Sequence, residues 1–109
     1  MKIYLIIGCI LIVSLIGIFY FLSKENKEDV VADCIHLCEE ALNSGRDLTS
    51  GPCLGDPIKN HEDWVCDVAH YPRNHSIDDL PENQCSAFRE GRARHFVEVT
   101  PSCELIRIY

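Results

Sequence analysis

Residues 3–22 of the chain, IYLIIGCILIVSLIGIFYFL, form a run of twenty residues without a charged side chain. As a helix rising about 1.5 Å per residue, the run spans about 30 Å, the thickness of a bilayer's hydrocarbon core. Tyr4, Tyr20 and Phe21 lie near its ends, where aromatic side chains meet the membrane interface. We therefore predict a transmembrane helix from Ile3 to Leu22, with the lipid bilayer as the first partner.

Three alternative roles for this run are less consistent with its residues. A buried core helix needs cover on all sides, and the remaining chain is too small to supply it. A cleaved secretory signal has a shorter apolar region and then a small-x-small site, which residues 19–24 do not offer. Lipid attachment at Cys9, within the lipobox-like residues 6–9, would normally require more apolar residues before the cysteine.

Six of the seven cysteines lie beyond the apolar run. An even number of cysteines in a domain of about eighty residues is typical of three disulfides formed in an oxidising compartment. Lysines flank the run on both sides, so the count of positive charges does not decide its orientation. The cysteines therefore predict that the C-terminal part lies outside the cytoplasm, at the cell membrane. They are Cys34, Cys38, Cys53, Cys66, Cys85 and Cys103.

Residues 23–29 are expected to form a charged stalk, and residues 30–109 a single disulfide-stapled domain. Apolar residues at helical spacing predict a helix over residues 30–44, with Asp29 capping its start and Gly45 ending it. Residues 44–63 and 72–83 have the composition of loops. Residues 84–89 predict a short helix that Gly91 ends.

Strand patterns follow at residues 64–70, which Pro72 closes, and at residues 94–100 and 103–109, which form a hairpin through Pro101 and Ser102. The predicted fold class is α+β, with one main helix packed on a short antiparallel sheet of about three strands. Fifteen disulfide pairings are open to six cysteines. We expect helix Cys34 and Cys38 to pair with strand Cys66 and Cys103, which leaves Cys53 with Cys85.

Residues 30–109 hold fourteen acidic against seven basic side chains, a net charge of −7. This balance repels phosphate backbones, so nucleic acid is excluded as an expected partner.

Residues 64–75, WVCDVAHYPRNH, gather the side chains that most resemble a reactive site. A zinc site needs three or four converging ligands, but alternation along a strand directs Asp67 and His70 to opposite faces. No paired metal-ligand motif occurs elsewhere, so no metal and no other cofactor is expected. The candidate ligands are His61, Asp63, Asp67, His70 and His75.

The catalytic candidates are Asp67, His70, His75 and Glu82. The spacing of Cys34 and Cys38 differs from that of a thioredoxin-like pair, and no serine lies in a nucleophile elbow. Structural disulfides are therefore favoured over thiol redox chemistry.

Asp67 is an acid among apolar neighbours and needs a partner. Arg89, Arg92, Arg94 or a backbone N–H would serve. The three arginines are also expected to pair with the acidic loop at residues 78–82.

The segments GPC at residues 51–53, WVCDVAH at 64–70, PENQC at 81–85 and HFVEV at 95–99 resemble small membrane-anchored proteins of methanogenic archaea. The resemblance carries no activity, cofactor or partner over to this chain.

The sequence therefore predicts a membrane-anchored extracytoplasmic binding or structural module of the cell envelope, more consistent with a non-enzyme. Another envelope protein is the second expected partner. The alternative is a small envelope enzyme or metal-binding domain that uses Asp67, His70 and His75. Convergence of these side chains in a cleft would favour the alternative.

Overall fold

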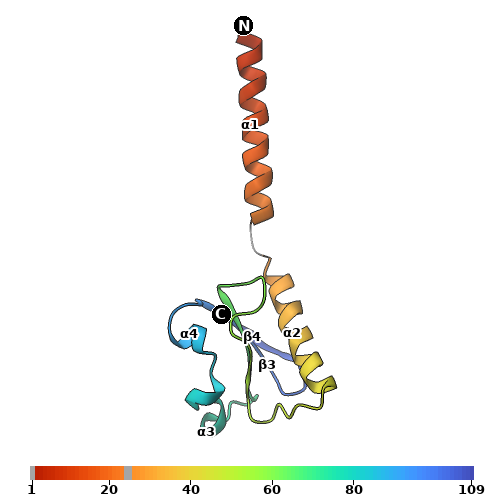
Figure 1. Cartoon of the computed structure of the whole chain (residues 1–109), viewed down its shortest axis with the longest axis vertical. Coiled ribbons are helices and arrows are strands. Elements are labelled where there is room, and N and C mark those ends of the chain that lie inside the picture. Colours follow the sequence, from red (N-terminus) through yellow and green to blue (C-terminus); the bar gives the residue numbers. More distant parts are fainter. Residues whose placement is uncertain (1, 24–25) are drawn as a thin grey trace.

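The computed structural model of the protein describes residues 2–23 and 26–109. Helix α1, Lys2–Ser23, extends away from a compact C-terminal domain (Figure 1). Its segment Lys2–Phe19 is long and apolar enough to cross a membrane by length and composition, and none of it is buried against the rest of the chain.

Helix α2, Lys27–Asn43, begins three residues before the expected start. Asn26 caps it instead of Asp29, because the Asn26 side chain accepts a hydrogen bond from the backbone N–H of Glu28 at 3.1 Å. The last part of the expected stalk is therefore helical. Gly45 follows the C-terminus with a φ of +83°, the left-handed conformation predicted for it.

The domain contains a four-stranded sheet in the order β1-β2-β3-β4. The strands are β1 (Cys53–Gly55), β2 (Trp64–Val68), β3 (His95–Val99) and β4 (Leu105–Ile108). The α+β class is confirmed, with two differences from the expected sheet. Strand β1 forms within a predicted loop, and β2 pairs with β3 in parallel, whereas the outer pairs are antiparallel.

The parallel pair results from the crossover formed by residues 69–94. Parallel strands cannot be joined by a tight turn, and this segment returns the chain to the same end of the sheet. It contains α3 (His75–Asp78), the 3-10 turn η1 (Pro81–Asn83) and α4 (Ser86–Arg89). The predicted loop at residues 72–83 thus contains two short helical turns, and the predicted short helix is α4.

The sheet separates two layers: α2 covers one face, and α3 and α4 lie on the other (Figure 1). The α2 face carries the larger apolar core, to which the sheet contributes Trp64, Cys66, Val68, Val97 and Val99. A smaller apolar cluster on the crossover face is built around Val65, Cys85, Ala87 and Ala93.

Three disulfides link these layers, and they are the pairs expected from the sequence. Cys34–Cys66 and Cys38–Cys103 fasten α2 to the sheet and to the turn before β4. Cys53–Cys85 fastens β1 to the residue before α4. Cys34 and Cys38 are therefore not bonded to each other. Among the described cysteines, Cys9 in α1 is the free one.

Candidate functional site

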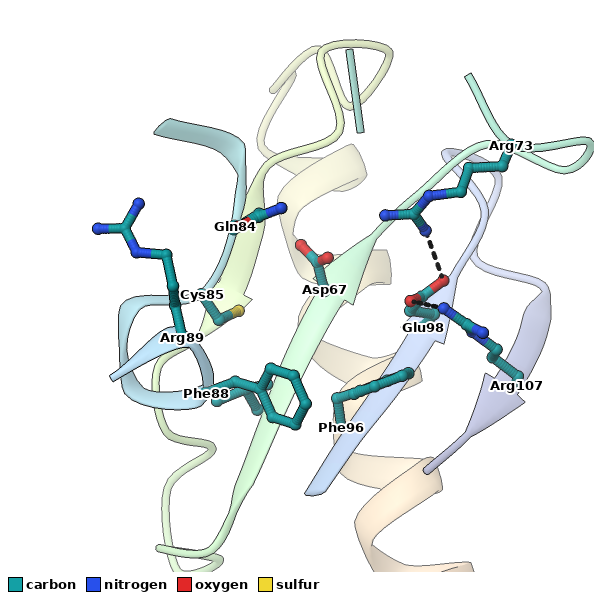
Figure 2. Close-up of a pocket in the computed structure, with 10 residues that line it drawn as sticks. Asp67, Arg73, Gln84, Cys85, Phe88, Arg89, Phe96, Glu98 and Arg107 are labelled. Carbon is teal, nitrogen blue, oxygen red and sulfur yellow. Dashed lines mark hydrogen bonds and ion pairs between the residues drawn. The ribbon is translucent and has the colours of Figure 1, made fainter. Parts of the chain in front are cut away.

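Asp67 lies in β2, and its side chain is on the crossover face of the sheet (Figure 2). In the parallel register its partner on β3 is Glu98. Side chains at paired positions of neighbouring strands share a face and lie close together. The fold therefore places two carboxyl groups side by side, in a position where two negative charges would repel each other.

A cavity of about 230 Å³, called here the Asp67 cavity, opens between this part of the sheet and the crossover. Phe88 and Phe96 form an apolar corner, with ring centroids 5.0 Å apart and ring planes nearly perpendicular. The Arg107 guanidinium lies 5.1 Å from the centroid of the Phe96 ring. The lining residues are Val65, Asp67, Arg73, Gln84, Cys85, Phe88, Arg89, Phe96, Glu98 and Arg107.

Glu98 has charged partners on both sides. Its Oε1 accepts a hydrogen bond from Nη2 of Arg107 at 3.0 Å, and its Oε2 lies 3.6 Å from Nη1 of Arg73. Figure 2 shows the carboxylate between the two guanidinium groups. The buried negative charge of Glu98 is therefore matched within the domain.

Among the described residues Asp67 forms no ion pair, and a backbone hydrogen bond from Val68 reaches its carboxyl group. Its Oδ1 atom is buried and accepts no hydrogen bond from any of them. Burial raises the pKa of Asp67 to about 8, and the charge of Glu98 acts in the same direction, while Arg73 opposes it in part. Burial therefore favours the protonated form of Asp67 at neutral pH, and this form can donate a hydrogen bond.

The three arginines expected to serve Asp67 or the acidic loop have other positions. Arg92 pairs with Glu90 at 2.8 Å, and Arg94 pairs with Asp63 at 2.9 Å. The prediction that these two arginines contact Asp67 or the acidic loop is therefore wrong. Arg89 lines the Asp67 cavity and donates a hydrogen bond to the Pro81 carbonyl at 3.4 Å.

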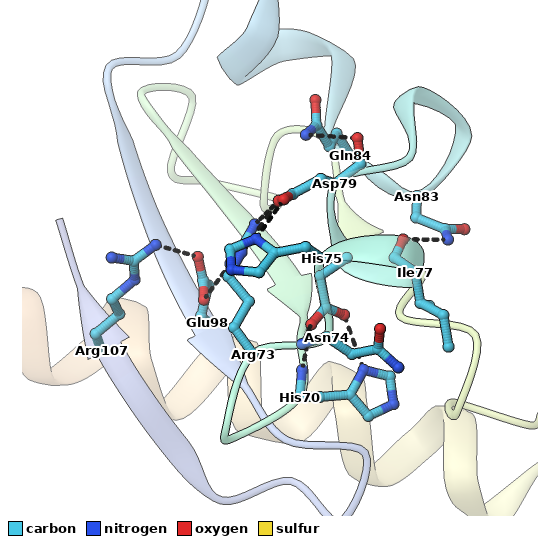
Figure 3. A network of polar contacts seen from close by, with 11 residues as sticks. His70, Arg73, Asn74, His75, Ile77, Asp79, Asn83, Gln84, Glu98 and Arg107 are labelled. Carbon is cyan, nitrogen blue, oxygen red and sulfur yellow. Dashed lines mark hydrogen bonds and ion pairs between the residues drawn. The ribbon is translucent and has the colours of Figure 1, made fainter.

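The acidic loop is paired by Arg73, an arginine that the sequence pattern did not assign to it. Arg73 donates from Nη2 to Oδ1 of Asp79 at 2.6 Å and also approaches Glu98 (Figure 3). A chain of ionic contacts thus runs from Arg107 through Glu98 and Arg73 to Asp79. This chain fixes one wall of the Asp67 cavity.

His70 is part of a structural turn rather than of the cavity. The buried Asp78 carboxylate accepts hydrogen bonds from the backbone N–H groups of His70 at 3.0 Å and Asn74 at 2.9 Å, and His70 Nδ1 lies 2.8 Å away. Burial alone would raise the pKa of Asp78, but these hydrogen bonds outweigh it and keep that pKa below its usual range. This acid holds the crossover against the end of β2.

His75 and Glu82 are exposed, and neither lines the Asp67 cavity. His75 Nδ1 lies 2.6 Å from Oδ2 of Asp79. Of the four catalytic candidates, the structure places only Asp67 in this cavity. The residues that sequence reasoning missed are Arg73, Phe88, Phe96, Glu98 and Arg107. One signal was present, since Glu98 interrupts an apolar strand as Asp67 does.

The predicted metal candidates do not form a ligand group within residues 2–23 and 26–109. Only Cys53, Asp56 and Cys85 bring three potential ligand atoms within 4.8 Å of one another there. Both of these cysteines belong to one disulfide, so they offer no thiolate. His61, another candidate, lies 2.7 Å from Asp33.

Comparison of the chain with family models, with curated proteins and with solved structures finds no match. The function is therefore inferred from the geometry of the Asp67 cavity and from the apolar helix α1.

Proposed function

We propose that the chain is a single-pass membrane protein whose C-terminal domain lies outside the cytoplasm and binds a small ligand in the Asp67 cavity. Helix α1 supplies the anchor, and residues 30–109 supply the binding module. Another protein of the envelope remains a predicted second partner.

The compartment is inferred from the disulfides and the anchor together. All six cysteines beyond α1 are paired, as is typical of domains that fold in an oxidising compartment. An apolar helix at one end of such a domain suits a chain that crosses the membrane once, with the domain on the oxidising side.

The observation that carries the binding role is the state of Asp67. A buried polar atom without a hydrogen-bond partner costs about 1–3 kcal/mol, and native proteins keep few of them. An apolar residue at this position of β2 would serve the fold better. Because Oδ1 of Asp67 has no hydrogen-bond partner among the described residues and the side chain lines a cavity with an aromatic corner, this oxygen is best satisfied by a bound molecule.

The location is tested with an epitope tag joined by a flexible linker after Tyr109. An antibody should bind the tag on intact cells, and a tag placed before Met1 should become accessible only after permeabilisation. Accessibility of the N-terminal tag alone would show the opposite orientation. Migration of the mature chain without α1 would show a cleaved signal and remove the anchor.

Binding is tested on the full chain in lipid nanodiscs. A panel of small anionic, neutral and cationic aromatic compounds is titrated while the aromatic resonances of Phe88 and Phe96 are recorded. At least one class should shift both rings, and Trp64, which lies in the α2-face core, serves as the reference signal. If no compound of any charge shifts the two phenylalanines, the binding role is wrong.

A second candidate function is acid–base catalysis at Asp67. It is favoured by one observation, the pKa of about 8 beside a second carboxyl group. A group that gains and loses its proton near neutral pH suits proton transfer. In this version Asp67 acts without His70 and His75, whose contacts lie outside the cavity. Turnover of any bound compound, lost in Asp67→Asn, would favour the enzyme over the binding module.

A further inference from the structure

The Asp67 cavity has an uneven charge. Three arginines, Arg73, Arg89 and Arg107, and two acids, Asp67 and Glu98, are among the residues that line it. The lining residues therefore include more basic than acidic side chains, and the raised pKa of Asp67 increases this difference at neutral pH. The excess favours an anionic ligand.

Arg89 is the cation available to such a ligand. Arg107 is paired with Glu98, and Arg73 with Asp79 and Glu98. Arg89 forms no ion pair with any residue that the structure describes, and its guanidinium is held by the 3.4 Å hydrogen bond to the Pro81 carbonyl. A guanidinium presents a planar set of donors that matches a carboxylate.

The remaining lining defines the body of the ligand. Phe88 and Phe96 meet at a right angle, and Val65 lies beside them in the same lining. A cavity of about 150 Å³ lined by apolar side chains holds a benzene molecule. The 230 Å³ available here therefore accommodates one aromatic ring with a small polar substituent.

We infer that the Asp67 cavity binds a small aromatic carboxylate, whose charge pairs with Arg89, whose ring packs on Phe88 and Phe96, and one of whose oxygens accepts a hydrogen bond from Asp67. This inference rests on the proposed binding function and specifies its ligand class. Hydrogen bonds between a neutral acid and a carboxylate are charge-assisted and short.

The protonation of Asp67 makes this binding dependent on pH. The charged groups around it are Glu98 of β3, Arg107 of β4, Arg89 of α4, Asp78 of α3, and Arg73 of the crossover. Below about pH 8 the acid donates to the ligand. Above it, the ionised Asp67 repels the ligand's carboxylate, so affinity should fall as the pH rises from about 7 to about 9.

The test compares three probes on the full chain in nanodiscs: benzoate, benzamide and benzylammonium, followed by the Phe88 and Phe96 resonances. Benzoate should bind about tenfold more tightly than the other two at about pH 6.5, the worth of one charge-assisted contact. Arg89→Gln should remove this preference. Arg92→Gln is the matched control, because Arg92 lies nearby in sequence, pairs with Glu90 and does not line the cavity.

The Asp67→Asn variant tests whether ionisation of Asp67 causes the pH dependence, because asparagine has nearly the same shape but does not ionise. The amide keeps a donor, so benzoate should still bind at about pH 6.5, but its affinity should no longer fall between about pH 7 and pH 9. Equal or tighter binding of benzamide or benzylammonium overturns the carboxylate inference and leaves the binding function standing. If none of the three probes shifts the Phe88 and Phe96 resonances, the inference is also overturned. The wider panel of aromatic compounds then tests whether the cavity binds any ligand.

Discussion

The two faces of the sheet use the same strands for different purposes. On the α2 face the buried residues are apolar or disulfide-bonded, and two disulfides fasten α2 over them. On the crossover face the apolar cluster is smaller, and two acids, three arginines and a cavity share the surface. Because side chains alternate along a strand, β2 and β3 each contribute side chains to both faces of the sheet. We therefore expect stability to be concentrated on one face and recognition on the other.

The largest expected effect concerns the α2 face. Replacing Cys34 and Cys66 together by alanine should lower the free energy of unfolding by about 2–5 kcal/mol, because the disulfide no longer restricts the unfolded chain. Denaturant titration of the full chain in nanodiscs measures it. Cys9→Ala, at the free cysteine of α1, is the control and should leave the domain unchanged. If removal of Cys53–Cys85 lowered the free energy of unfolding by more than removal of Cys34–Cys66, stability would not be concentrated on the α2 face.

The next effect distinguishes the structural acid of the crossover from Asp67. Asp78→Asn should destabilise the domain by about 2 kcal/mol, because an amide cannot accept all three hydrogen bonds that this carboxylate accepts. The folded pKa of Asp78 is lowered, so its contribution is present above about pH 4 and lost as the pH falls further. Thermal melts at about pH 7 and about pH 3 should therefore differ less in the variant than in the wild type.

Asp67 should show the opposite pH dependence. Its folded pKa of about 8 lies above the unfolded value, so the stability that its proton contributes is complete below about pH 4 and declines as the pH rises to 8. Asp67→Asn should flatten this decline, which amounts to about 1.4 kcal/mol for each pH unit between about pH 4 and pH 8, and should make the domain more stable than the wild type at pH 8. Melts across this range measure it, with exposed Glu62→Gln as control. An unchanged pH profile would show that Asp67 has a partner in solution.

The smallest effect lies on the solvent side of α2. Glu40→Ala removes the exposed contact of 3.0 Å with His36, which should change the free energy of unfolding by less than about 0.5 kcal/mol. Denaturant titration should not separate this variant from the wild type. A larger change would mean that the stability of the α2 face depends on its charged surface as well as its core.

The sequence predicted the parts of the fold that follow from local pattern. The pattern of residues 64–70 predicted β2, and the expected disulfide between this strand and α2 is Cys34–Cys66. The parallel pairing of β2 and β3 was not predictable in the same way. It depends on where the crossover of residues 69–94 packs, and this segment has no long apolar periodicity.

The candidate site shows the same limit. Asp67 was recognised as an acid in need of a partner, because a single residue and its neighbours suffice for that inference. Glu98 became its neighbour only through the parallel register, and Arg73 and Arg107 come from segments on either side of β3. Long side chains such as arginine reach several partners, so sequence separation does not reveal which carboxylate each one meets.

The two disulfides of α2 also determine how the domain responds to force. Helix α2 begins at Lys27, four positions after α1 ends, so tension applied through α1 reaches α2 first. Covalent bonds then carry the load to β2 through Cys34–Cys66 and to the turn before β4 through Cys38–Cys103. The hydrogen-bonded ladder between β2 and β3, which forms the floor of the Asp67 cavity, is bridged on both sides. The strands that carry Asp67 and Glu98 are thus not the first part of the domain to bear the load.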